Sequence, residues 1–296
     1  AVREYQKNGF CVSLGEWNKD EAGNPLPYLD RYEIRIVKDV NAALAEFLAG
    51  NIDIFNPSTV DHISQIRQAV QQGRLDATIK VNASPVASSQ FMVFNWNKAS
   101  DPFKQSLFRS DKFRRAMSHL VNRQAVIDIV YGGLGTPMYS SVYPVLTQWI
   151  NPKVPKYEYD PKQAAKLLAE LGFTKKDREG YLVDSKGRRI EFNLATNAGN
   201  TQREQIAKLI VDEAKKVGVK VNFQAIDFNT LVGQLLSSGP DRPFDAIIIG
   251  LTGGGLDWPF GSNVVPCKGN LHMWNKSGQC LDPRETLMEK LYYQGR

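Results

Sequence analysis

The segment 244–258 contains the residues whose types and spacing best suit contact with a ligand. Its sequence, FDAIIIGLTGGGLDW, is an apolar run that stops at Gly250 and is followed by glycines at 253, 254 and 255. Glycine lets another backbone approach closely, because it has no side chain. A carboxylate and a flat apolar ring follow, which can pair with a ligand ammonium and stack on a ligand side chain. The candidate ligand-binding residues of this segment are Thr252, Gly253, Gly254, Asp257 and Trp258. The alternative is a glycine-rich turn in which Asp257 is a capping residue.

These glycines do not fit a phosphate-binding loop. Such loops follow G-x-G-x-x-G or G-x-x-x-x-G-K-[ST] and open a helix whose first N–H groups face the phosphate. The glycines match neither spacing, and LDWPFGSNVVP is too irregular to open a helix. A catalytic nucleophile is not indicated either, because the chain has no G-x-S-x-G segment and only three histidines. We therefore expect a ligand that is held unchanged, with no catalytic residue, cofactor or metal.

The chain has three cysteines, and two of them bound a short polar segment. Cys267 and Cys280 enclose CKGNLHMWNKSGQC, while Cys11 lies far away in the sequence. A disulfide between the two would contribute about 3 kcal/mol by loop entropy and would indicate an exported protein. Free thiols are one alternative. A zinc site of Cys267, His272 and Cys280 is another, but it follows no common spacing and lacks a fourth ligand.

Alternating helices and strands in the second half would position these residues. Asp160 and Pro161 begin a predicted helix that Gly172 ends, and Thr201 with Glu204 forms a predicted capping box. The further predicted elements are a hairpin over 181–196, a helix from 201 to Gly218, a strand over 219–226, a helix over 229–238 and the strand over 244–250. This order predicts parallel strands in an α/β layer. Ligands of such sheets bind beyond the carboxyl ends of the strands.

The first half predicts further strands and helices. Residues 32–39 alternate as a half-buried strand, with Ile34 and Ile36 on one face. Asn41 is predicted to cap a helix that Gly50 ends. The further predicted elements are strands over 52–55, 75–82 and 90–96, helices over 59–72 and 111–131, and a long loop over 132–155. His119 lies beside an apolar stripe of the 111–131 helix and is interpreted as structural.

Composition and charge are those of an ordinary globular protein. Hydrophobic residues make up 42% and charged residues 23%, and no apolar run has the length needed to span a bilayer. The net charge of +6 comes from scattered Lys and Arg without a zinc-finger or RNA-binding pattern, so no nucleic-acid partner is expected. The first residues, AVREYQKNGF, have no signal-peptide core and read as the middle of a strand. We expect a piece of a longer protein.

Five segments, in this order, resemble one known family. They are RIVKDVNAALAEFLAGNIDIF, DKFRRAMSHLVNRQAVIDIVYGGLGTPMYSSVYP, YDPKQAAKLLAELGF, REQIAKLIVDEAKKVGVKVNFQAIDFNTL and FDAIIIGLTGG. Together they are similar to the peptide/nickel-type (family 5) extracellular solute-binding proteins of ABC importers, which include oligopeptide- and dipeptide-binding proteins. The resemblance runs from about Tyr5 almost to the end of the chain.

The resemblance implies a bilobed α/β protein of the class II periplasmic-binding-protein-like fold, of which this chain is a truncated piece. Residues 1–88 then correspond to the middle of the first lobe. Residues 89–296 correspond to the second α/β lobe with a truncated return, and the hinge is expected near 83–90. The whole protein, nearly twice as long, would have a signal peptide and be periplasmic or extracellular, or lipid-anchored. It would be a monomer that passes its solute to a membrane permease, whereas the fragment is expected to self-associate.

The resemblance also implies a peptide ligand, with one departure. Relatives hold a peptide's amino group with the Asp of a W-x-x-D motif, but this chain has Leu251-Thr252-Gly253-Gly254 there, and Asp257 follows three residues later. Asn197 and Phe228 match positions where relatives line the pocket, and core packing is the alternative for Phe228. A nickel chelate, an oligosaccharide or another small solute is the alternative ligand. A hydrolase that uses cleft carboxylates is the alternative of another class.

Overall fold

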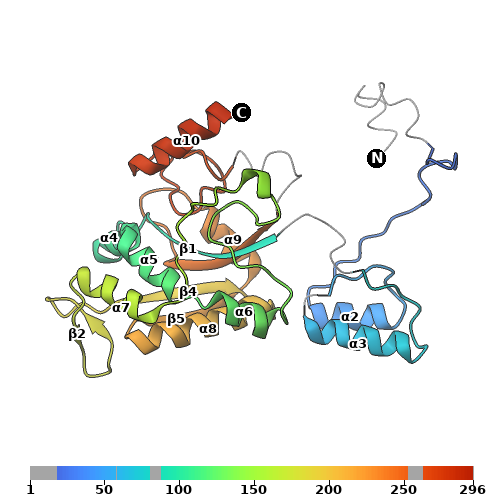
Figure 1. Ribbon diagram of the computed structural model, residues 1–296, viewed down its shortest axis with the longest axis horizontal. Coiled ribbons are helices and arrows are strands. Elements are labelled where there is room, and N and C mark those ends of the chain that lie inside the picture. The colour runs from blue at the N-terminus through green and yellow to red at the C-terminus, as the bar shows by residue number, and fades with distance from the viewer. Residues whose placement is uncertain (1–18, 58, 81–87, 253–262, 296) are drawn as a thin grey trace. The chain divides into compact units, whose positions relative to one another are not determined.

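The computed structural model describes residues 19–57, 59–80, 88–252 and 263–295 (Figure 1). The chain divides into two compact units, Ala1–Ala43 and Leu44–Arg296. Within the described residues, no helix combines the length and the apolar character needed to cross a membrane. The sheet that positions the candidate site lies entirely in the second unit.

Residues 19–80 contain two helices and none of the strands predicted there. Helix α2, Val40–Leu48, and helix α3, Val60–Gln71, share an apolar cluster built on Leu44, Phe47 and Ile66. The predicted strands at 32–39 and 52–55 are wrong, and no strand forms in 75–80. Ile34 and Ile36 are 76% and 88% exposed rather than half-buried. An isolated strand leaves its backbone groups without partners, and these segments have no neighbouring strand among the described residues.

A mixed sheet forms the centre of the second unit (Figure 1). Its strands are β1 (Ser88–Phe94), β4 (Glu191–Asn197), β5 (Lys220–Ile226) and β6 (Ala246–Thr252), in the order β1-β6-β4-β5. Strand β4 is parallel to both β5 and β6, as the sequence predicts. Strand β1 is antiparallel to β6, with Ser88 opposite Thr252 and Phe94 opposite Ala246. The hairpin of β2 (Lys175–Lys176) and β3 (Leu182–Val183) is separate.

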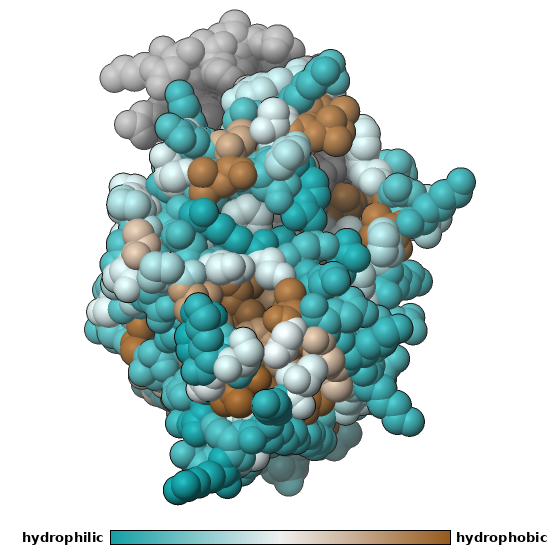
Figure 2. Space-filling model, turned by 90° about the vertical axis from the view of Figure 1, so that its left-hand side faces the viewer, coloured by the Kyte–Doolittle hydropathy of each residue, from teal (hydrophilic) through white to brown (hydrophobic). Residues whose placement is uncertain are grey.

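Apolar cores cover both faces of this sheet. On one face, four phenylalanines meet with ring centroids 5.2–6.2 Å apart; they are Phe94, Phe108, Phe113 and Phe192. The helices of this side are α4 (Pro102–Arg109), α5 (Asp111–His119), α7 (Pro161–Glu170) and α8 (Thr201–Val217). On the other face, Ile247 and Ile249 pack against Leu231 of α9 (Phe228–Leu236) and Met273 of the 263–282 loop. The outer surface beside α4, α7 and the β2–β3 hairpin is mostly hydrophilic, with apolar side chains gathered in a hollow (Figure 2).

Helix boundaries differ from the prediction where a side chain other than the predicted one caps the helix. The predicted single helix over 111–131 is two helices, α5 and α6 (Arg123–Val130), because Asn122 Oδ1 accepts from the N–H of Ala125 and starts a new helix. Asn200 caps α8 in place of Thr201, and Glu204 accepts from the N–H of Gly199. Helix α2 is capped by Asp39 in place of Asn41. The Asp160 cap of α7 is confirmed.

The predicted loop over 132–155 holds only a short 3-10 turn, Thr147–Trp149. The last described element is helix α10, Pro283–Gly295. Two buried charged residues connect other parts of the second unit, since Asp245 joins α4 to β4 and Arg242 joins α9 to the 263–282 loop. Asp245 accepts from Lys104 at 2.8 Å and from the N–H of Asn193 at 3.0 Å. The guanidinium of Arg242 is fully buried, donates to the carbonyl oxygens of Leu235 and Met273, and has its pKa lowered by burial to about 10.

Replacing Phe192 by alanine should remove the common partner of the aromatic cluster. Phe192 is fully buried and contacts Phe94, Phe108 and Phe113, so we expect a loss of about 3–5 kcal/mol in the free energy of unfolding. Phe228→Ala is the matched control, because Phe228 is 51% exposed and its loss should cost under about 1 kcal/mol. Urea unfolding followed by tryptophan fluorescence measures both. Equal losses in the two variants would contradict this description of the core.

Candidate functional site

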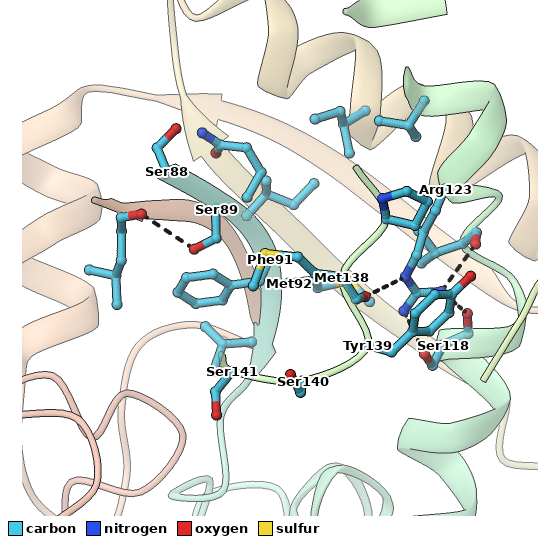
Figure 3. A pocket seen from close by; sticks show the side chains of 18 of the residues that line it. Ser88, Ser89, Phe91, Met92, Ser118, Arg123, Met138, Tyr139, Ser140 and Ser141 are labelled. Carbon is cyan, nitrogen blue, oxygen red and sulfur yellow. Dashed lines mark hydrogen bonds between the residues drawn. The ribbon is translucent and has the colours of Figure 1, made fainter. Parts of the chain in front are cut away.

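An apolar cavity runs along the whole of β1. Every residue from Ser88 to Phe94 contributes to its wall. The rest of the wall within 88–295 comes from α5, α6, α8, the end of β6, the 132–155 loop, the 263–282 loop and the start of α10. Figure 3 shows Phe91 and Met92 of β1 and Met138 and Ser140 of the loop among the residues that line the cavity. Many of the side chains that line the cavity are apolar, and the hydroxyls of Ser88, Ser89, Ser140 and Ser141 lie among them.

Strand β1 is the edge strand of its sheet, and this gives the cavity its chemistry. It is paired only with β6, so alternate backbone N–H and C=O groups on its outer side have no strand partner among the described residues. Met92 packs with the core of one face and Phe91 with the core of the other. The wall therefore offers both a row of backbone hydrogen-bonding groups and apolar side chains on either side of it.

Arg123 holds the 132–155 loop beside the cavity. Its Nε donates to the carbonyl oxygen of Met138 at 3.1 Å and its Nη1 to that of Tyr157 at 3.1 Å. Its Nη2 donates to Ser118 Oγ at 2.8 Å, and its guanidinium lies 5.0 Å from the ring centre of Tyr139 (Figure 3). Burial lowers the pKa of Arg123 from its ordinary value. The guanidinium is thus used to position the loop.

The end of β6 differs from the sequence-based interpretation. The strand continues two residues past Gly250, to Thr252, because β1 pairs with it that far. A Cβ at Gly250 would lie 2.7 Å from the side-chain amide nitrogen of Gln90, so the absent side chain makes room for Gln90 of this chain. Thr252 and Leu251 line the cavity. Tyr143 of the long loop donates to the carbonyl oxygen of Leu251 at 3.1 Å.

Four of the predicted residues of this segment, Gly253, Gly254, Asp257 and Trp258, lie outside the described residues. Two other predicted residues, Asn197 and Phe228, are described, and neither lines the cavity. Asn197 ends β4, and Phe228 is the first residue of α9. Since Phe228 is 51% exposed, it is not a core residue.

Arg203, which the sequence did not indicate, does not line the cavity itself but contacts Gln90, which does. Its Nη1 donates to Asn197 Oδ1 at 2.8 Å and its Nε to Gln90 Oε1 at 2.9 Å, so β4, α8 and β1 meet through one guanidinium. Burial lowers the pKa of Arg203, and no acidic side chain forms an ion pair with it among the described residues. Nearby Tyr131 lines the cavity, and its hydroxyl is buried without a hydrogen-bond partner among them. The sequence pattern that could have indicated Arg203 is a basic residue in the first turn of a helix that closely follows a strand.

Cys267 and Cys280 form a disulfide with their Cα atoms 5.3 Å apart. Fully buried His272 lies in the loop that this bond closes, with Nδ1 2.9 Å from the carbonyl oxygen of Val264 and Nε2 3.0 Å from Glu285 Oε1. Leu271, Met273 and Trp274 of the same loop line the cavity. The disulfide therefore restrains a segment of the cavity wall.

Comparison with known proteins identifies similar chains. The sequence model of the bacterial extracellular solute-binding proteins, family 5 Middle, matches residues 16–269. A "Probable ABC transporter-binding protein" of Deinococcus radiodurans is 53% identical over 96% of this chain and 49% of its own length. The oligopeptide-binding protein AppA of Bacillus subtilis is 32% identical over 80% of this chain and 41% of its own length.

Solved structures show the same fold. The structure of AppA in complex with a nonapeptide superimposes with a TM-score of 0.63 and 26% identity, over 88% of this chain and 50% of that one. The structure of MelB from Agrobacterium fabrum in complex with stachyose gives a TM-score of 0.66 at 18% identity, over 86% of this chain and 40% of that one, which is a likeness of fold alone. The chain spans about half the length of the relatives that it matches.

Replacing Arg123 by glutamine should loosen the loop that it holds. The shorter amide side chain cannot make the three separate hydrogen bonds to Met138, Tyr157 and Ser118, so amide hydrogen exchange over 136–159 should become at least about tenfold faster. Arg188→Gln is the matched control, because Arg188 pairs with Asp184 in a turn that is separate in sequence from the 132–155 loop. Exchange in the loop that is equal in the two variants would show that Arg123 does not position it.

Proposed function

Because the chain belongs to the bacterial extracellular solute-binding proteins, family 5, we propose that the whole protein captures peptides and delivers them to the permease of an ABC importer. The observation that carries the peptide assignment is the cavity along the edge strand β1. An extended peptide can bind such an edge as an additional strand, through main-chain hydrogen bonds that do not depend on its side chains.

The apolar side chains of the wall suit the side chains of a peptide. In an extended peptide, successive side chains point to opposite sides, and Phe91 and Met92 offer apolar surface on the two sides of β1. Flexible methionines such as Met92 and Met138 adapt to side chains of different shape. This combination favours binding of many peptide sequences, which suits nutrient uptake.

Two charges would hold the ends of the peptide. Arg203, a cation without an acidic partner among the described residues, is assigned to an anionic group such as the terminal carboxylate. Asp257, which Trp258 follows in the sequence, is assigned to the terminal ammonium. In this role Asp257 replaces the acid that is absent from the W-x-x-D position. Thr252, Gly253 and Gly254 complete the proposed site, Asn197 positions Arg203, and Phe228 offers an exposed ring beyond the site.

The alternatives are weaker. None of the three histidines is among the cavity-lining residues of the described chain, and the two carboxylates that line it, Asp282 and Glu285, already accept hydrogen bonds from Arg284 and from the N–H of Leu281 respectively, which disfavours a hydrolase. A sugar or a metal chelate would use the polar groups and leave most of the apolar wall without a partner. We therefore assign a non-enzymatic role.

The family match supports a role outside the cytoplasmic membrane. We propose a periplasmic or extracellular protein, anchored by lipid where no periplasm exists. Residues 1–88 are assigned to part of the first lobe and 89–296 to the second, with closure near 83–90. The full-length protein is expected to be a monomer. A fragment with exposed Tyr32, Ile34 and Ile36 is expected to self-associate.

Calorimetry on the full-length protein tests the peptide assignment. Material that co-purifies is first identified by mass spectrometry, with mixed peptide masses expected, and then removed. Arg203→Gln should weaken binding of a free-carboxylate peptide about tenfold to a hundredfold, because a charge-assisted hydrogen bond contributes about 1.5–3 kcal/mol. Binding of the same peptide as its C-terminal amide should change little. Asp257→Asn should likewise weaken binding of a peptide with a free amino terminus. It should change little the binding of the same peptide with an acetylated amino terminus.

Arg188→Gln is the control, since Arg188 lies in the exposed turn beside Asp184. A single sugar or metal chelate as the co-purified ligand would contradict the peptide assignment. Equal losses for the free and the blocked peptides would leave that assignment standing and reject the role of the two charges.

A further inference from the structure

The 263–282 loop and the first turns of α10 bring together five residues of the kind that bind zinc. The ligand atoms of Cys267, His272 and Glu285 all lie within 4.8 Å of one another, and so do those of Cys267, Cys280 and Glu289. The sequence suggested two cysteines and one histidine without a fourth ligand. The structure supplies the missing carboxylate from α10.

His272 has the hydrogen-bond arrangement of a metal ligand. Its Nδ1 lies 2.9 Å from the carbonyl oxygen of Val264, which only accepts, so Nδ1 must carry a proton and donate it. Its Nε2 then faces Glu285 Oε1 at 3.0 Å, where a proton must lie between a nitrogen and a carboxylate that are 0% and 3% exposed. A backbone carbonyl that fixes one ring nitrogen, while the other points at the ion, is the usual outer-shell support of a zinc-binding histidine. A cation can take the place of the shared proton.

The carboxylates are held in position by other groups. Glu285 accepts from Trp274 Nε1 at 2.6 Å and from the N–H of Leu281 at 2.6 Å. Glu289 lies four residues further along α10, on the same side of the helix, and accepts from the N–H of Cys267 at 2.9 Å. The loop carrying the cysteines is therefore fastened to α10 by bonds that do not involve sulfur.

We propose that reduction of the Cys267–Cys280 bond creates a zinc site whose ligands are both thiolates, His272 Nε2 and one oxygen of Glu285. Two thiolates, one imidazole and one carboxylate suit the tetrahedral preference of Zn²⁺, with bonds of about 2.0–2.3 Å. Glu289 positions Cys267 through its backbone. The sulfur of Cys280, released from the bond, is the ligand that must move.

The chemistry of this exchange balances with a dithiol reductant. Two electrons from the dithiol break the S–S bond, the dithiol becomes a disulfide, and its two protons pass to the sulfurs of Cys267 and Cys280. Zn²⁺ then displaces these two protons and the proton between His272 and Glu285. The loop is closed in both states, so Leu271, Met273 and Trp274 keep their places in the cavity wall.

Metal titration of the chain with and without reduction tests the proposal. The Cys11→Ser background leaves only these two cysteines. After anaerobic reduction and removal of the reductant, we expect one Zn²⁺ bound per chain, and none bound tightly by the oxidised chain. Co²⁺ in place of Zn²⁺ should give thiolate charge-transfer absorption and the strong visible bands of a tetrahedral site.

Variants identify the ligands. Cys280→Ser and His272→Gln should each weaken Zn²⁺ binding at least about tenfold relative to the background, whereas His119→Gln, which alters a histidine elsewhere, should not. Circular dichroism of each variant checks that it is folded. If His272→Gln fails to fold, Zn²⁺ binding by Cys280→Ser and the Co²⁺ spectrum still test whether the thiolates bind the metal. Absence of Zn²⁺ from the reduced chain, or equal Zn²⁺ affinity in Cys280→Ser and His119→Gln, would overturn the proposal.

Discussion

The antiparallel pairing of β1 with β6 is the interaction on which the candidate site depends. It joins the segment that enters the α/β layer to the strand at its centre, from Ser88 opposite Thr252 to Phe94 opposite Ala246. Because β1 joins at the edge, its inner backbone groups pair with β6, its outer ones have no strand partner among the described residues, and the whole strand lines the cavity. A parallel strand in the interior of the sheet would have had both sides occupied. The proposed binding surface is thus a consequence of where this one strand lies.

Buried polar groups keep the rest of the cavity wall in register with that strand. Asn95, directly after β1, donates to the carbonyl oxygen of Phe244 at 2.8 Å, and the N–H of Trp96 donates to that of Trp274 at 2.8 Å. Arg242 reaches the carbonyl oxygen of Met273 at 2.7 Å. The last two bonds link the sheet to the 263–282 loop. Breaking one would leave a buried polar group without a partner, which costs more than the bond contributes.

Much of the second half of the fold could be predicted from the sequence. Strong helical periodicity, the Asp160 cap and the continuous apolar run of β6 are local signals, and the structure has α7, α8, β5 and β6 where these signals place them. In the first half, helices α2 and α3 lie where the sequence places them, whereas the strands predicted before residue 81 do not form, because alternation at Ile34 and Ile36 indicates a strand only where another strand accepts its hydrogen bonds. The break at Asn122 was missed since apolar spacing continues across it, while the cap acts through one side chain.

The site was less predictable than the fold. Gly250 was interpreted as space for a ligand, yet the space is filled by Gln90, which is 160 positions away in the chain and adjacent only through strand pairing. Arg203 contacts the cavity-lining residue Gln90 because β4, α8 and β1 converge, and no local pattern records that convergence. The resemblance to a family indicated a binding role, which the family match supports, whereas the contacts that define the cavity come from tertiary structure.

Amide hydrogen exchange of β1, with and without a bound peptide in the full-length protein, tests the central claim most directly. If a peptide binds as an added strand, the outward-facing amides among Ser88–Phe94 should exchange much more slowly in the complex. The inward-facing amides, already bonded to β6, should change far less. Saturating peptide that leaves exchange of the outward-facing β1 amides unchanged would contradict the account.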